Sequence, residues 1–270
     1  MASAFAVLLL TVLVSCATDP QKEPVPPPPV AQLSGDEVLA LEQAPGNTPA
    51  LADATEPAPA PVEGIEGTPG PSPAFGPAGA PVRVFVFTDF QCPVCRRAVE
   101  PLKYLARRHP TEVRIVFKQN ALYSHPRSAA AATASIAAFR QGKFWEYHDR
   151  LFRTGEMDDA SLEGHAQALG LNLEEFRKDL ADPAVSAQVK YEATLAVKLD
   201  LGSTPGFLVN GARQMGWSSY AGLESIVESE LDRARKIAET GMSASQVARA
   251  ATDQSGPNGK LLAEALFTAR

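Results

Sequence analysis

The sequence predicts an α/β domain in which a block of helices interrupts a small β-sheet. Three observations support this. An apolar run at residues 82–87 leads directly into Cys-Pro-Val-Cys and then into an amphipathic helical pattern. A second, alternating strand pattern is followed by helical patterns from about residue 126 to 200. After that block come a third apolar run, an Asn-Gly turn and a last amphipathic stretch, so the order is β-α-β, helical insertion, β-β-α.

The stretch around two of the cysteines predicts a strand, a turn and a helix. The apolar strand is bounded upstream by Gly79 and Pro81. Pro93 fits the first turn of the following helix, where its missing N–H costs nothing. Cys92 is thereby placed at a helix N-terminus, where unpaired N–H groups and the helix dipole favour a thiolate. The apolar face of the helix comprises Val94, Ala98, Val99, Leu102, Leu105 and Ala106.

The remaining elements are predicted from hydrophobic periodicity and from the residues that typically begin or end helices and turns. Residues 112–118 alternate as a second strand, with Val113, Ile115 and Phe117 on one face. Asn210-Gly211 is a strong signal for a two-residue hairpin. The helices are expected at 126–140, 143–152, 161–169, 173–180, 185–199 and 220–237, and the hairpin strands at 207–209 and 213–217.

The residues before the predicted domain differ from it in composition. Residues 2–14 are almost wholly apolar but short, which is typical of a signal peptide rather than a membrane span. They end in Leu-Val-Ser-Cys, which resembles the bacterial lipobox and predicts lipidation of Cys16 after removal of residues 1–15. An ordinary secretion signal with a chance cysteine is the alternative, and no Lys or Arg precedes the apolar run.

Sixteen of the 23 prolines lie between Pro20 and Pro81, where Lys22 is the single basic residue. Such a composition cannot bury enough apolar surface to fold, so a disordered Pro/Ala-rich tether is predicted at residues 16–79. The folded domain is expected at residues 80–240. Residues 241–270 would add one or two short helices, without an assigned function.

The composition argues for a folded domain and against a nucleic-acid-binding function. A hydrophobic content of 45 % supports a substantial core, and a net charge of −6 with a pI near 5.3 argues against a nucleic-acid-binding surface. With Cys16 lipidated, Cys92 and Cys95 would be the only exchangeable thiols. The leader predicts a bacterial periplasmic or cell-envelope location, with lipid anchoring to a membrane.

Three stretches in order resemble a known family. In these three stretches the chain resembles the DsbA-like thiol–disulfide oxidoreductases, and within them the subgroup with the Phe-x-Asp-Phe-x-Cys-Pro-x-Cys signature. The resemblance covers about residues 75–240 and implies a thioredoxin fold with an inserted α-helical domain. The stretches are Phe-Thr-Asp-Phe-Gln-Cys-Pro-Val-Cys at 87–95, Gln-Gly-Lys-Phe-Trp-Glu-Tyr-His-Asp at 141–149 and Gly-Ser-Thr-Pro-Gly-Phe-Leu-Val-Asn-Gly at 202–211.

The paired cysteines are the candidate catalytic residues. Exchange needs a thiolate, so Cys92 is expected to be the exposed nucleophile with a lowered pKa, aided by Arg96 and Arg97. Cys95, one turn deeper, would be the resolving thiol. Half of a zinc site is one alternative, but it needs a second cysteine pair or suitably spaced histidines, and the sequence has neither. A purely structural disulfide is the other.

A proline opposite the cysteines is the third catalytic candidate. The resemblance implies that Pro205 follows a cis peptide bond and that the backbone of Thr204 pairs with the substrate chain. On local sequence alone, an ordinary trans proline is an equal alternative. Pro93 and Val94, between the cysteines, are further candidate substrate-binding residues.

Two more residues are candidates for tuning the thiols. Asp89 lies three positions before Cys92 and could accept hydrogen bonds at the turn or tune the thiol, capping being the simpler interpretation. His125 precedes a predicted helix, where a solvated or capping histidine is the alternative. In thioredoxin and DsbA an acidic residue lies six positions before the first cysteine, whereas this chain has Val86 there. This departure puts a carboxylate proton shuttle in doubt.

Together these features predict an extracytoplasmic protein thiol–disulfide oxidoreductase. Its substrates would be secreted cysteine-containing proteins, and a membrane or soluble redox partner would reset its disulfide. No metal or organic cofactor is implied, since the cysteine pair itself carries the electrons. Pro93-Val94 lacks the histidine that DsbA has beside its second cysteine, which predicts a less oxidising protein. The alternatives are a lipid-anchored thioredoxin-fold binding module and a thiol metal chaperone.

Overall fold

The computed structural model describes residues 71–256 and 258–267, and within them the strands form one five-stranded sheet. Its strand order is β1-β3-β2-β4-β5. β2 and β3 are parallel, and every other neighbouring pair is antiparallel. The strands are β1 (Ala74–Phe75), β2 (Val82–Thr88), β3 (Val113–Gln119), β4 (Gly206–Val209) and β5 (Ala212–Met215).

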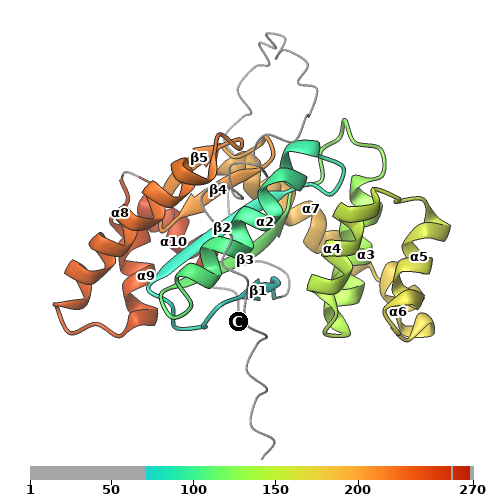
Figure 1. Ribbon diagram of the computed structural model, residues 1–270, viewed down its shortest axis with the longest axis horizontal. Helices are drawn as coiled ribbons and strands as arrows, with labels where there is room; N and C mark the ends of the chain where they lie inside the picture. Colours follow the sequence, from blue (N-terminus) through green and yellow to red (C-terminus); the bar gives the residue numbers. More distant parts are fainter. Residues whose placement is uncertain (1–70, 257, 268–270) are drawn as a thin grey trace, which may run out of the picture. The chain divides into compact units, whose positions relative to one another are not determined.

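The helices confirm the predicted order, with an insertion between β3 and β4. In Figure 1, α3, α4, α5 and α6 lie toward the right of the view, and α8, α9 and α10 lie toward the left. The described helices are α2 (Pro93–Arg108), α3 (Ser128–Arg140), α4 (Phe144–Thr154), α5 (Asp159–Ala168), α6 (Leu173–Leu180), α7 (Pro183–Lys198), α8 (Tyr220–Ala238), α9 (Ala244–Asp253) and α10 (Gly259–Phe267).

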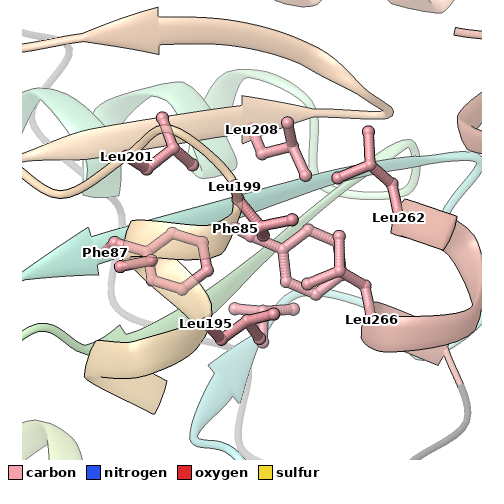
Figure 2. Packing of buried hydrophobic residues seen from close by; sticks show 10 residues of the cluster. Phe85, Phe87, Leu195, Leu199, Leu201, Leu208, Leu262 and Leu266 are labelled. Atoms are coloured by element: carbon pink, nitrogen blue, oxygen red, sulfur yellow. The ribbon is translucent and has the colours of Figure 1, made fainter. Parts of the chain in front are cut away.

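The alternation of the two central strands divides the core into two layers. Val86 and Thr88 of β2 share a face with Phe117 of β3, and this face lies against α2. The opposite face of β2 carries Phe85 and Phe87. Figure 2 shows that these two rings pack with leucines of α7, β4 and α10 and of the loop after α7, namely Leu195, Leu199, Leu201, Leu208, Leu262 and Leu266.

This second layer changes the expected division of the chain. Leu195, near the end of the predicted helical insertion, is 1 % exposed and packs on the sheet, so α7 belongs to the sheet's own core as well as to the helical block. Residues 241–267 form the two short helices that the sequence predicts, α9 and α10. Since Leu262 and Leu266 of α10 cover Phe85, the C-terminal extension completes the core.

The folded part begins earlier than residue 80, the predicted start. β1 pairs with β3, and the N–H of Phe117 donates to the carbonyl of Pro73 at 2.8 Å. Phe75 packs edge-on against Trp145, with 4.8 Å between ring centroids. A two-residue strand among prolines and glycines has no alternation to detect, which is why sequence analysis places it in the tether.

Several of the predictions concern the residues that precede the described part of the chain. The signal peptide, Cys16 and most of the tether lie outside the described residues. Among the residues that are described, no helix has both the length and the apolar character needed to cross a bilayer.

The hairpin between β4 and β5 confirms the two-residue turn. Asn210 and Gly211 both have positive φ, at 43° and 97°. The Asn210 side chain also ties the turn to β2, because Oδ1 accepts from the N–H of Arg83 and Nδ2 donates to the carbonyl of Pro81. A Cβ on Gly211 would lie 2.1 Å from Oγ of Ser255, so the turn needs glycine for space as well as for φ.

Candidate active site

Cys92 is the N-cap residue of α2. Its backbone is extended, with φ −75° and ψ 118°, and the helix begins at Pro93 as predicted. No side chain caps this helix end. The first N–H groups of a helix have no partner within the helix, and those of Val94 and Cys95 lower the pKa of Cys92 because they favour a thiolate there.

Hydrogen bonds lower the pKa of Cys92 to about 6, from an ordinary value of 9.0. The largest cause is the hydrogen bond from the Cys95 thiol, while burial acts in the opposite direction. The side chain of Thr204 contributes next, followed by the N–H groups of Cys95 and Val94. Oγ1 of Thr204 is buried and has no hydrogen-bond partner among the described residues, so this hydroxyl is available to the thiolate.

The predicted help from neighbouring arginines is not found among these causes. Nη2 of Arg96 instead donates to the carbonyl of Arg153 at 3.2 Å. The stabilisation of the Cys92 thiolate is therefore local, through hydrogen bonds at the first turn of α2 and from the loop before β4.

Cys95 lies inside the first turn of the helix and is 2 % exposed. Burial raises its pKa well above the usual value, and the neighbouring Cys92 raises it further. The side chain of Thr88 and the backbone of Asp89 act in the opposite direction. The pKa values of these two thiols, three positions apart, are therefore shifted in opposite directions, which places the thiolate on Cys92 and the proton on Cys95.

The loop before β4 places Thr204 and Pro205 against the cysteines. The Thr204–Pro205 peptide bond is cis, in agreement with the prediction. The Cys92 thiol donates to the carbonyl oxygen of Thr204 at 3.5 Å, and Pro205 lines the same cavity as Cys95. The carbonyl of Pro205 accepts from the N–H of Gly216 at 2.8 Å, which anchors the loop to the end of β5.

Cys92 is less exposed than the sequence predicts. It is 6 % exposed, because the Thr204 loop lies against its sulfur. A cleft of about 180 Å³ nonetheless reaches it, with Pro93, Phe152 and Met157 among its walls. Pro93 is exposed and Val94 is half-buried, so the dipeptide between the cysteines forms part of the rim.

Asp89 and His125 are brought together, but neither makes a described side-chain contact with a sulfur. Oδ1 of Asp89 accepts from the N–H of Gln91 at 2.7 Å, and Oδ2 accepts from the N–H of Leu122 at 2.8 Å. Nδ1 of His125 lies 2.9 Å from Oδ2, although not at a hydrogen-bonding angle. Asp89 thus joins the turn before Cys92 to the loop after β3, which favours the structural interpretation.

Two further polar residues at the site, Thr88 and Gln91, are not among those predicted from the sequence. Thr88 contacts the Cys95 thiol, and its signal was available, because alternation along β2 places it on the same face as Val86. The side chain of Gln91 accepts from the N–H of Arg127 at 2.6 Å, linking the active-site turn to the start of α3. A contact over 36 positions has no sequence pattern that could have revealed it.

Comparisons with known proteins agree with this geometry. The sequence model of a family described as thioredoxin matches residues 68–229, more than half of the chain. The solved structure of a thioredoxin-like oxidoreductase from Silicibacter pomeroyi is 32 % identical, with a TM-score of 0.55 over 61 % of this chain and 92 % of that one. The catalytic domain of Proteus mirabilis ScsC is 26 % identical, with a TM-score of 0.52 over 60 % of this chain and 89 % of that one.

One similar protein is named for a different activity. It is the Na⁺/H⁺ antiporter NhaA 3 of Salinispora tropica, 35 % identical over 181 residues. The match covers 66 % of this chain but spans only 28 % of the antiporter.

The fold, the Cys-Pro-Val-Cys turn and the family match define a thioredoxin-fold redox protein. The chain belongs to the thioredoxin family and is similar to a thioredoxin-like oxidoreductase.

Proposed function

We propose that the chain exchanges disulfides with protein substrates through a mixed disulfide on Cys92, which Cys95 resolves. The observation that carries this proposal is the division between the two sulfurs. Cys92 has hydrogen bonds that stabilise its thiolate and a cleft that reaches it, whereas Cys95 is buried and holds its proton. A thiolate is the attacking species in exchange, and a second thiol behind it can release the substrate.

The carbonyl of Thr204 gives the substrate a place to bind. It lies 3.5 Å from the Cys92 sulfur and is within the reach of a peptide attached there. In the proposed complex, the substrate backbone pairs with Thr204, its cysteine bonds to Cys92 and a neighbouring side chain occupies the cleft beside Pro93. The cysteine pair is the redox carrier, with no metal or organic cofactor.

The location and partners are proposed from the sequence. The leader and Cys16 support a lipid-anchored protein in the periplasm or cell envelope, acting on secreted cysteine-containing proteins. A membrane or soluble redox partner would reset the pair after each exchange.

The direction of exchange depends on how strongly the thiolate is stabilised. A Cys92 pKa of about 6 lies between the values of about 7 for thioredoxin and about 3.5 for DsbA. Since their potentials are about −270 and −120 mV, we expect the potential of this pair to lie between these two values. The protein is therefore less oxidising than DsbA, as the missing histidine predicts. Equilibration with glutathione buffers and counting of free thiols measures this value.

Two substitutions test the proposed mechanism. Cys95→Ser should trap a mixed disulfide with a reducible protein, visible as a larger species on non-reducing gels. Cys92→Ser should form no such species and should have no turnover. Turnover by Cys92→Ser equal to that of the unaltered chain would instead support the binding-module alternative, and stoichiometric binding of Cu(I) without exchange would support the metal chaperone.

A further inference from the structure

Cys95 lines a small cavity between the sheet and the helices. Its volume is about 20 Å³, which is enough to admit one water molecule. β2, β3, α2 and α4 all contribute walls, and most of the lining is apolar. The polar side chains on its lining are Thr88, Lys103 and His148.

The resolving step needs a proton acceptor in this place. Cys95 must lose its proton before its sulfur can attack, yet burial holds its pKa well above the usual value. Val86 lines the same cavity and has no group that can take a proton. Thioredoxin and DsbA have an acidic residue at this position, so here water or another group has to accept the proton.

His148 has the arrangement of a base. Its side chain is 6 % exposed, and Nδ1 lies 2.9 Å from Oδ1 of Asp149. A proton on Nδ1 would be donated to that carboxylate, which leaves Nε2 with a lone pair; this tautomer is inferred from the Asp149 contact. Burial lowers the pKa of His148, so the ring is neutral at neutral pH, whereas the contact with Asp149 acts in the opposite direction and favours the protonated form.

Asp149 connects this buried ring to solvent. Its side chain is 38 % exposed, and Oδ2 lies 2.7 Å from Nζ of Lys103. The charged groups that act on His148 are Asp149 on its own helix and Lys103 and Glu100 on α2. Asp149 therefore gives a proton held on His148 a route from the interior to the surface.

We propose that His148 is the base that takes the proton of Cys95 during resolution, directly or through one water in the cavity. This inference rests on the proposed function. The Cys95 proton passes to Nε2 of His148, and the sulfur's electron pair forms the bond to Cys92. The bond between Cys92 and the substrate sulfur breaks, and the substrate leaves as a thiolate. The cysteine pair is oxidised and the substrate disulfide reduced; in the reverse direction the imidazolium returns the proton to Cys95.

His148→Gln in the full chain tests the proposal. The probe is a peptide disulfide with a fluorescent leaving thiol, and acid quenching separates formation of the Cys92 mixed disulfide from its resolution. Resolution at pH 7 should slow by about 100-fold, the lower end of the range for general-base catalysis. It should also become steeply pH-dependent, rising about tenfold per pH unit, because hydroxide then replaces the base.

Mixed-disulfide formation provides a readout that mere structural damage would change. In a Cys95→Ser background, adding His148→Gln should leave its rate unaltered, since Cys92 needs no base. Val86→Asp restores a carboxylate to the cavity and should recover at least part of the lost resolution rate in the His148→Gln chain. His165→Gln, a matched change at a buried histidine of α5 outside the cavity, should keep the original rate and pH profile.

The outcomes separate this inference from the proposed function. Unchanged resolution and an unchanged pH profile in His148→Gln would overturn the role of His148, while exchange itself stands. Absence of any mixed disulfide in the unaltered chain would overturn the proposed function instead. If His148→Gln does not fold, Asp149→Asn decides: a several-fold slower resolution with a steeper pH profile supports the relay, and an unaltered profile excludes it.

Discussion

At the scale of single residues, position within one helical turn determines the chemistry of the two sulfurs. Cys92 at the N-cap faces unpaired N–H groups, and Cys95 three residues later faces the interior. The spacing alone predicts this much. The burial of Cys92 depends on Thr204, which is 112 positions away, so no local pattern could predict it.

The Cys92 thiolate should make the stability of the reduced chain pH-dependent. The pKa of Cys92 falls from 9.0 to about 6 on folding, so between these values the unfolded state binds more protons. The free energy of unfolding should therefore rise with pH across this window, by at most about 1.4 kcal/mol per pH unit, and this gain is lost as pH falls through 6. Urea unfolding of the reduced chain at pH 6, 7 and 8 measures the slope.

The oxidised chain and the reduced Cys92→Ser variant are the controls, because neither has a thiolate at Cys92. Both should lack this part of the slope. Cys95, with its raised pKa, acts only above about pH 9. Parallel pH dependence in all three proteins would contradict the lowered pKa of Cys92.

Replacement of Asp89 distinguishes a structural role of this residue from a role in setting the pKa of Cys92. Asp89→Ala removes the acceptor for the N–H groups of Gln91 and Leu122. Leaving two such groups unpaired should lower the free energy of unfolding by about 2–4 kcal/mol. The Cys92 thiolate, followed by absorbance at 240 nm, should titrate as before. A shift of a full pH unit in that titration would show that Asp89 tunes the thiol.

At the scale of elements, periodicity predicts most of the fold and fails where an element is short or shared. The limits of α6 and the Asn210-Gly211 turn agree with the sequence analysis. β1 is missed because two residues have no period. Periodicity also does not indicate which neighbour a helix packs against, so it places α7 in the insertion although Leu195 belongs to the sheet core.

Two adjacent leucines of α10 test whether the C-terminal extension is part of the core. Leu262 is 3 % exposed and packs in the layer with Phe85, whereas Leu261 is 49 % exposed. Leu262→Ala should lower the free energy of unfolding by about 2–5 kcal/mol, because it leaves a cavity. Leu261→Ala should change it by less than about 0.5 kcal/mol, because a surface position loses little. Equal effects in chemical denaturation would mean that α10 does not cover the sheet.

At the scale of the whole described domain, one buried ion pair joins three distant segments. Nζ of Lys118 on β3 lies 3.2 Å from Oε1 of Glu192 on α7, and the two side chains are 4 % and 0 % exposed. The same carboxylate accepts from Ser72 at 2.9 Å and from the N–H of Gln119 at 2.8 Å. Buried charges need such partners to remain ionised. Since 120 positions separate Ser72 and Glu192, this network is invisible to sequence patterns.

This network predicts where the folded domain must begin. A chain that starts at residue 80 lacks Ser72, the Pro73 carbonyl and Phe75, so it leaves Glu192 and the N–H of Phe117 short of partners. Its free energy of unfolding should be about 2–4 kcal/mol below that of a chain starting at residue 71. Ser72→Ala in the longer chain, which removes one hydroxyl, should lower it by about 1 kcal/mol. Equal stability of the two chains would return the boundary to residue 80 and make β1 an accessory strand.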